Sequence, residues 1–244
     1  MRRILMLIFI SSMGLAVSFG QRPSGNESDR AELLQKLRSD KVDDRVGAYE
    51  KLRTDSSALR DPSVKTALID LLDRESHVAL NDEQEGYIEY ISELTDTVTN
   101  LADWEDQRQV CILVRSPYPP RDAIASHAKI AVPCLLQKAQ SRESLGRGRA
   151  IAILVQALGT KTNELDSATV QRIQQVILNA LHDQAFDVRA LTVEALGRFG
   201  QQDMIPALQQ ISETDPTPAA PNGYSIRKLA GEAIASIQKR SGQN

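Results

Sequence analysis

The chain has 244 residues, of which 41% are hydrophobic and 4% aromatic, so it can bury a sizeable core built mainly from small aliphatic side chains. Lys and Arg total 29 against 32 Asp and Glu, which gives a formal net charge of −3 with both signs mixed along the sequence. This balance excludes the clustered basic stripe that would predict a nucleic-acid partner.

The first twenty residues have the plan of a secretory signal peptide. Arg2 and Arg3 form a positive start, residues 4–10 are apolar, and small residues follow. We expect cleavage after Ser18 or Gly20. The alternative is an uncleaved membrane anchor, but the apolar run is shorter than the roughly 20 residues that a spanning helix needs. We therefore predict a secreted or periplasmic protein with no stable membrane insertion after cleavage.

Helical periodicity follows a flexible lead-in at residues 21–27 and continues to residue 240, without strand alternation. The pattern predicts an all-α fold of five helix pairs between two end helices. In chain order these helices cover residues 31–39, 43–55, 63–75, 84–104, 105–115, 121–131, 132–141, 146–159, 167–182, 187–200, 204–215 and 224–240. Pro133 and Pro206 are each expected in the first turn of a second helix, where a missing N–H group costs no hydrogen bond.

One motif returns at a fixed offset. Asp187–Gly200 reappears 38 positions later at Ser225–Gln238, with Arg189 on Arg227. Asp43–Asp55 carries the same skeleton 144 positions upstream, which corresponds to four repeats averaging 36 residues. Self-similarity at this period is typical of solenoid proteins.

The order of the motifs resembles the HEAT repeat family, particularly its short bacterial form. Asp-Val-Arg stands at 187–189, Ala-Leu-Gly at 195–197 and Ile-Pro-Ala-Leu at 205–208, and a shift of 38 finds Ala-Leu-Gly again at 157–159. The likeness is weakest at residues 79–115. The resemblance implies that residues 28–244 form an α-solenoid, a right-handed superhelix of about five antiparallel HEAT-like helix pairs with capping helices.

The repeated charged residues are interpreted as structural. We expect Asp43 and Asp187 to cap free N–H groups where their helices begin. Arg45, Arg189 and Arg227 are expected to reach the corresponding turn of an adjacent repeat. Together these residues would form a ladder that joins the repeats.

Two cysteines, Cys111 and Cys134, each lie in an apolar helical run. An exported chain permits a disulfide between them. The alternative is that both are separate small buried hydrophobic residues. The sequence leaves both readings open, because bridging depends on helix register.

No constellation for catalysis is evident. His77, His127 and His182 are scattered, no pair has the spacing of a helical metal site, and there is no nucleophile-elbow motif. We therefore predict no catalytic, metal-binding or cofactor-binding residues, and a protein that is not an enzyme.

The second helices of the pairs are rich in glutamine, which offers both a donor and an acceptor without charge. A surface of this kind could bind a peptide backbone, although glutamine also favours exposed helix positions in general. Two proline-rich loops add one tyrosine each, and spacers are the alternative role for these loops. The candidate partner-binding residues are Gln137, Lys138, Gln140, Gln171, Arg172, Gln174, Gln175, Gln209, Gln210, Tyr118 and Tyr224.

The function predicted from these patterns is that of an exported, monomeric, non-enzymatic scaffold for a protein or peptide partner. The alternative is an accessory or regulatory subunit of an envelope enzyme or protease complex. A third class, implied by the resemblance, is a chromophore-lyase-like HEAT protein, because some HEAT-like proteins assist chromophore attachment to antenna proteins. That role requires action in the cytoplasm, which the export signal contradicts.

Overall fold

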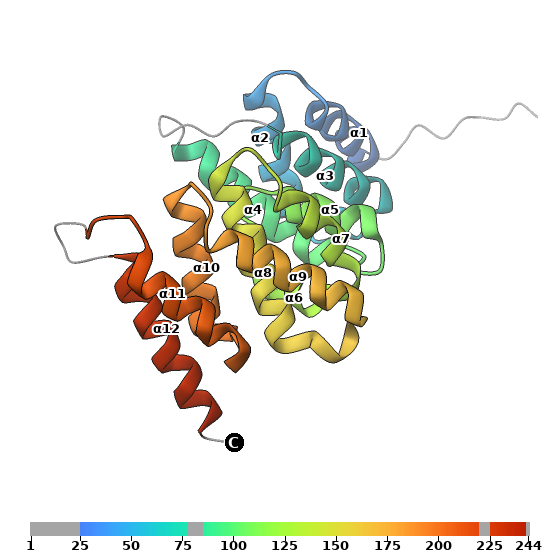
Figure 1. The fold of residues 1–244 in the computed structure, drawn as a ribbon. Helices are drawn as coiled ribbons and strands as arrows, with labels where there is room; N and C mark the ends of the chain where they lie inside the picture. The colour runs from blue at the N-terminus through green and yellow to red at the C-terminus, as the bar shows by residue number, and fades with distance from the viewer. Residues whose placement is uncertain (1–24, 78–84, 220–224, 243–244) are drawn as a thin grey trace, which may run out of the picture.

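The computed structural model describes residues 25–77, 85–219 and 225–242, and these form helices with no strand among them (Figure 1). The predicted signal peptide, residues 21–24 and Tyr224 lie outside the described residues. The α-helices are α1 (Gly25–Leu37), α2 (Val42–Arg53), α3 (Pro62–Glu75), α4 (Glu85–Leu101), α5 (Gln107–Arg115), α6 (Arg121–Ser126), α7 (Ala128–Lys138), α8 (Ser144–Lys161), α9 (Ser167–Ala180), α10 (Phe186–Phe199), α11 (Ile205–Thr214) and α12 (Ile226–Ser241). Short 3₁₀ turns are η1 (Ala58–Arg60), η2 (Thr162–Glu164) and η3 (Gln202–Met204). The prediction of an all-α fold is confirmed.

Local sequence explains where several helices begin. The Asp61 side chain accepts a hydrogen bond from the Ser63 backbone N–H and so caps α3, which starts with Pro62. Asp106 caps α5 and Asp166 caps α9 in the same way. Pro206 stands in the first turn of α11, as its sequence predicts.

The third predicted pair breaks earlier than expected. α6 ends at Ser126 and α7 begins at Ala128, so Pro133 lies inside α7 and the prediction that it starts a helix is wrong. His127 makes the break, because its φ and ψ of −109° and 38° are not helical. Its backbone N–H donates to the Ile124 carbonyl at 3.2 Å, and its own carbonyl accepts from the first turn of α7.

Each helix packs mainly against helices one or two places away in chain order, from α1–α3 at one end to α12 at the other (Figure 1). α8 is central and contacts α6, α7, α9 and α10, while α10 also packs on α12. One continuous apolar core extends from Leu37 to Ile237. A single core that crosses all these helices explains how short helices can be stable together.

Glycines let α8, α10 and α12 approach closely. A Cβ atom added to Gly148 would lie 2.9 Å from Leu191 Cδ1, and one added to Gly159 would collide with the backbone carbonyl of Phe199. A Cβ atom on Gly197 would lie 3.3 Å from that of Ala233 on α12. The glycines of the two repeated Ala-Leu-Gly triplets therefore mark the places where successive helices touch.

An arginine near the start of α2, α8 and α10 clamps the loop before its helix. Arg45 donates from Nη1 to the carbonyls of Ser39 and Asp40, both at 3.0 Å, and from Nε to Glu75 Oε1 at 2.5 Å. Arg45 and Glu75 are 4% and 0% exposed, and the hydroxyl groups of Tyr87 and Tyr90 also donate to Glu75. The hydrogen bond that Arg45 donates to Glu75 raises the pKa of Arg45.

The other two clamps repeat this geometry. Arg147 binds both oxygens of Asp183 at 2.9 Å and the Ser141 carbonyl at 2.6 Å. Arg189 donates to Asp215 Oδ2 and to the Asp183 carbonyl, both at 2.7 Å. The hydrogen bond from Arg147 lowers the pKa of Asp183. Burial alone would raise the pKa of Asp215, but the hydrogen bond from Arg189 helps to lower it below its usual value.

The remaining members of the predicted ladder differ from expectation. Asp43 and Asp187 are exposed in the first turns of α2 and α10, two positions after the N-cap residue, so the capping role predicted for them is wrong. Their charges instead lie at the positive end of each helix dipole. Arg227 donates from Nε to the Asp215 backbone carbonyl at 2.7 Å and ties the start of α12 to the end of α11.

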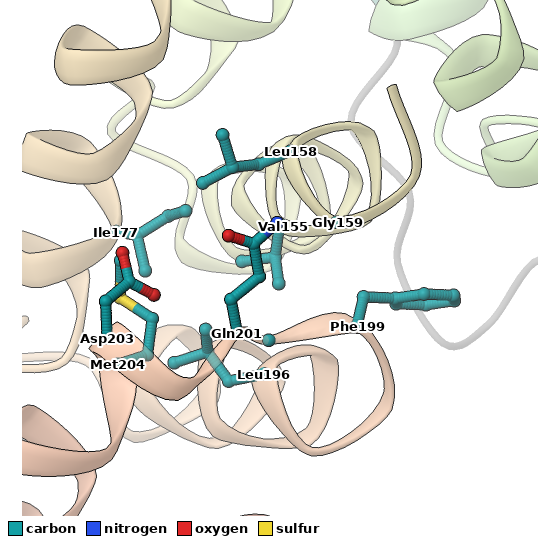
Figure 2. A pocket seen from close by; sticks show the side chains of 10 residues that line it. Val155, Leu158, Gly159, Ile177, Leu196, Phe199, Gln201, Asp203 and Met204 are labelled. Atoms are coloured by element: carbon teal, nitrogen blue, oxygen red, sulfur yellow. The ribbon is translucent and has the colours of Figure 1, made fainter. Parts of the chain in front are cut away.

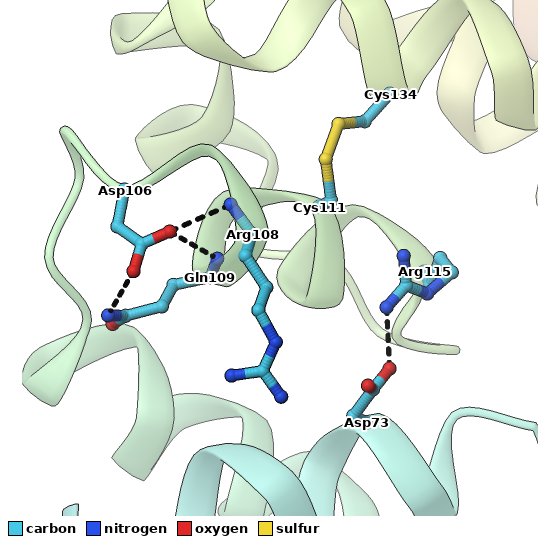
Figure 3. The surroundings of a disulfide bond; sticks show 7 residues. All are labelled: Asp73, Asp106, Arg108, Gln109, Cys111, Arg115 and Cys134. Atoms are coloured by element: carbon cyan, nitrogen blue, oxygen red, sulfur yellow. Dashed lines mark hydrogen bonds and ion pairs between the residues drawn. A yellow bond between two sulfur atoms is a disulfide. The ribbon is translucent and has the colours of Figure 1, made fainter. Parts of the chain in front are cut away.

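A disulfide joins Cys111 on α5 to Cys134 on α7, with the two Cα atoms 5.4 Å apart (Figure 3). α5 is also tied to α3, because Arg115 Nη2 lies 2.5 Å from Asp73 Oδ1. A second ion pair, between Arg108 and an Asp70 oxygen, measures 2.7 Å. The bridge therefore joins α5 to α7, and the ion pairs join α5 to α3.

Candidate functional site

A groove of about 230 Å³ lies between α7 and the start of α9, and we call it the α7–α9 groove. One wall comes from α7, and the other from η2 and the first turn of α9. Its lining residues are Lys129, Val132, Pro133, Glu164, Leu165, Asp166 and Thr169. The first turns of both helices flank the same groove, so α7 and α9 present corresponding ends to it.

Pro133 gives the α7 wall an unusual acceptor. Within a helix, the carbonyl of Lys129 would accept from the N–H group of residue 133, and proline has none. The Lys129 carbonyl is therefore left without its usual helical donor on the wall of the groove. A backbone acceptor of this kind suits a ligand that donates N–H groups, such as an extended peptide.

The α9 wall is acidic and fixed in place. Asp166 accepts from the backbone N–H and the hydroxyl of Thr169, at 2.8 and 2.7 Å, and the hydrogen bond from this hydroxyl lowers the pKa of Asp166. Glu164 lies 2.7 Å from the ammonium of Lys161. Because these contacts fix the acidic wall before anything binds, little ordering is needed on association.

Some of the predicted partner-binding residues continue this groove. Gln137 lies four positions after Pro133, one turn further along the same face of α7, and both are exposed. Gln140 extends that exposed line, and Arg172 stands one turn beyond Thr169 on α9. Within the described residues, the side chains of Gln137 and Gln140 make no hydrogen bond. None of the predicted residues lines the groove itself, but Gln137 and Arg172 each lie one helical turn from a lining residue.

The other glutamines differ in their surroundings. Gln174 Nε2 donates to Asp203 at 3.1 Å, and Gln175 Nε2 donates to Asn179 at 2.9 Å, so both amides are partly engaged. Gln171 is exposed on α9. Gln209 and Gln210 are also exposed, but they lie on α11, which packs against α12 rather than lining the groove.

Two further candidates are occupied within the chain. The Lys138 ammonium lies 3.7 Å from a Glu143 oxygen. The half-buried ring of Tyr118 lies 5.3 Å from the guanidinium carbon of Arg149, which also donates to the Pro117 carbonyl. The contacts of Arg149 anchor the proline-rich loop onto α8.

A second groove, of about 180 Å³, lies over α8 between the start of α6 and the exposed side of α10, and we call it the arginine groove. No sequence pattern marks it, because its residues come from three helices and share no motif. Its lining residues are Arg121, Ala152, Gln156, Leu191, Glu194, Ala195, Arg198 and Phe199.

A third hollow, at the far ends of α8 and α10, belongs to the packing. Figure 2 shows Val155, Leu158, Ile177, Leu196 and Met204 converging on it. Its volume of about 10 Å³ has room for about one water molecule. It is too small to hold a ligand.

The histidines do not gather with other metal-binding groups. In the part of the chain that the structure describes, no three His, Cys, Asp or Glu side chains are placed to hold a metal ion. His127 stacks on Trp104 with ring centroids 4.5 Å apart, and its Nδ1 lies 2.9 Å from the Ala123 carbonyl. His77 is exposed, 3.8 Å from Asp73. Within the same residues, no helix is long and apolar enough to cross a bilayer.

Comparison with known proteins adds little to this picture. No family model matches the chain, and no curated protein matches it. Among solved structures, the crystal structure of an engineered protein is similar, with a TM-score of 0.42 and 15% sequence identity. That match covers 86% of this chain and 97% of the engineered one.

Proposed function

We propose that the mature chain is an exported α-solenoid of HEAT-like helix pairs and acts as a non-enzymatic scaffold. In this proposal, an extended segment of a partner protein binds in the α7–α9 groove and along the exposed glutamines beyond it. The observation that carries the proposal is the alignment of three features on one side of α7: the groove, the Lys129 carbonyl without its helical donor, and the free amides of Gln137 and Gln140.

Several contacts support a solenoid. The close approaches of Gly148 to Leu191 and of Gly159 to Phe199 keep one register along α8 and α10, and Gly197 continues it to Ala233 on α12. The arginine clamp recurs at the first helix of three pairs. The outer faces of α1 and α12 are largely polar, as terminal repeats require, and this favours a monomer.

The disulfide supports export. Disulfide bonds persist in secreted and periplasmic proteins and are rare in the reducing cytosol. A link between α5 and α7, on the same helix that forms the groove wall, also stiffens the proposed binding surface. A stiff surface loses less conformational entropy when a partner binds.

The test is selection of a random peptide library on the mature chain, residues 21–244, followed by binding measurements with the enriched peptides. The variant Pro133→Arg places a bulky side chain in the groove and restores a backbone N–H group within α7. Because arginine is a far better helix former than proline, this variant should remain folded. We expect it to lose peptide binding.

The matched control is Ser236→Arg, which adds the same side chain at an exposed position of α12. It should bind the enriched peptides as the parent chain does. Equal binding by the parent and Pro133→Arg would refute the groove as the site, as would a library that yields no binding peptides.

A further inference from the structure

We propose that the arginine groove is a second binding site, one that takes the carboxylate side chain of an acidic partner segment. It involves different helices from the α7–α9 groove and does not depend on the function proposed for that groove. A chain with two such sites would bring two partners together.

The shape of the groove fits a single acidic side chain. α8 forms the floor, because both α6 and α10 pack on it. The apolar groups of Ala152, Leu191 and Ala195 line the groove, and its volume is about 180 Å³. Such a floor can cover the methylene groups of a glutamate while its carboxylate reaches the walls.

The walls supply two free cations. Arg121 at the start of α6 and Arg198 on α10 are exposed, and the side chain of neither makes a hydrogen bond or ion pair within the described residues. Arg149, one turn before Ala152 on α8, is instead held by Tyr118 and the Pro117 carbonyl. Guanidinium groups match carboxylates in shape and charge, so the two free arginines favour an acidic ligand over other peptide segments.

Two carboxylates partly offset the positive charge of the arginines at the groove. Glu194 lines the groove, and Asp122 lies beside it, where it accepts from Gln156 Nε2 at 2.7 Å. With Arg149 included, three cations oppose two anions, so the excess is small. Binding through exposed charges should therefore be weak and should decrease as salt is added.

The experiment measures the fluorescence anisotropy of a labelled oligoglutamate peptide mixed with the mature chain at low and high salt. Labelled oligoglutamine and oligolysine serve as comparison probes. We expect oligoglutamate to bind best at low salt, and the double variant Arg121→Ala/Arg198→Ala to weaken its binding roughly tenfold. Arg121→Glu/Arg198→Glu should reverse the preference towards oligolysine.

The matched control is Arg60→Ala/Arg142→Ala, which removes two exposed arginines that also lack side-chain partners in the described residues but lie outside the groove. It should bind oligoglutamate as the parent does. Equal weakening in both double variants would show attraction to the overall charge and overturn the proposal, and so would the absence of oligoglutamate binding at millimolar peptide. Circular dichroism of each variant checks that the helices are retained.

Discussion

The N-terminal helices α1–α4 and the C-terminal helices α8–α12 use the same arginine clamp but are packed differently around it. In the first region, Glu75 is fully buried against Arg45, and the rings of Tyr49 and Tyr90 meet edge to face, 5.5 Å apart. In the second, glycines and alanines bring helix backbones together. Of its two clamps, the Arg189–Asp215 pair is buried and the Arg147–Asp183 pair is partly open to water. The same ion pair therefore contributes differently to the free energy of unfolding in different surroundings. Removing one partner of a buried pair destabilises the fold more than removing one partner of an exposed pair.

The largest expected effect comes from breaking the buried clamp. Glu75→Ala leaves the Arg45 charge buried without its partner, which should lower the free energy of unfolding by about 3–5 kcal/mol. Asp183→Ala, in the partly open clamp, should cost clearly less because water can reach Arg147. Urea denaturation of the two variants measures the difference, and equal losses would contradict the contrast between the buried and the partly open clamp.

The disulfide lies between the two regions and should have the next largest effect. It closes a loop with a sequence separation of 23, for which chain entropy predicts about 3 kcal/mol of stabilisation. We expect Cys111→Ala/Cys134→Ala to melt at a lower temperature than the oxidised parent. The same melting temperature for both would show that the bridge adds nothing to stability.

Tryptophan fluorescence can report the effect of losing the disulfide on one part of the fold, the surroundings of Trp104. It is the only tryptophan, and it stacks on His127 at the break between α6 and α7. If loss of the bridge loosens only the middle of the stack, tryptophan fluorescence should change at a lower temperature than the circular dichroism signal. Coincident transitions would indicate that both regions unfold as one unit.

Gly→Ala substitutions should change stability least. The change should be a loss at a packed glycine and a gain at an open one. Gly159→Ala places a methyl group against the Phe199 carbonyl and should destabilise the chain by about 1–3 kcal/mol. Gly231→Ala on α12 and Gly47→Ala on α2 meet no neighbouring atom, so each should stabilise its helix by about 0.5–1 kcal/mol. Thermal melts of the three variants test the contrast, and a harmless Gly159→Ala would contradict the close contact of α8 with α10.

Local signals predicted the helices well and their joints less well. Pro206 stands in the first turn of its helix as predicted, and Asp61 with Pro62 starts α3, because capping and proline chemistry act within one turn. Pro133 follows the same four-residue pattern as Pro206 but lies inside α7, because the chain breaks at His127 instead. A motif shared by two repeats does not ensure the same place in the helix.

Arg147 shows why one clamp was missed. It performs the same role as Arg189 but lies 42 residues before it, whereas the two Ala-Leu-Gly glycines lie 38 apart. α8 has 18 residues and α10 has 14, so one additional helical turn separates the clamp from the glycine in the earlier repeat. A search at a fixed offset loses the arginine, although in space it occupies the same position.

The two candidate sites also differ in whether the sequence could indicate them. The amide-rich face of α7 was visible in the sequence, since exposed residues recur along a helix at a known period. The arginine groove was not, because Arg121 and Arg198 are 77 positions apart and only the packing of α6 and α10 on α8 brings them to one place.

The sequence by itself determined the all-α class, the order of the helices and most of their starts, because these depend on periodicity and on contacts within a turn or two. Tertiary structure alone decided that Cys111 meets Cys134, that Glu75 is the acid which completes the first clamp, and where the grooves lie. Each of these depends on the rotation and spacing of one helix against another. Those quantities are set by the packing of many side chains at once and leave no local signature in the chain.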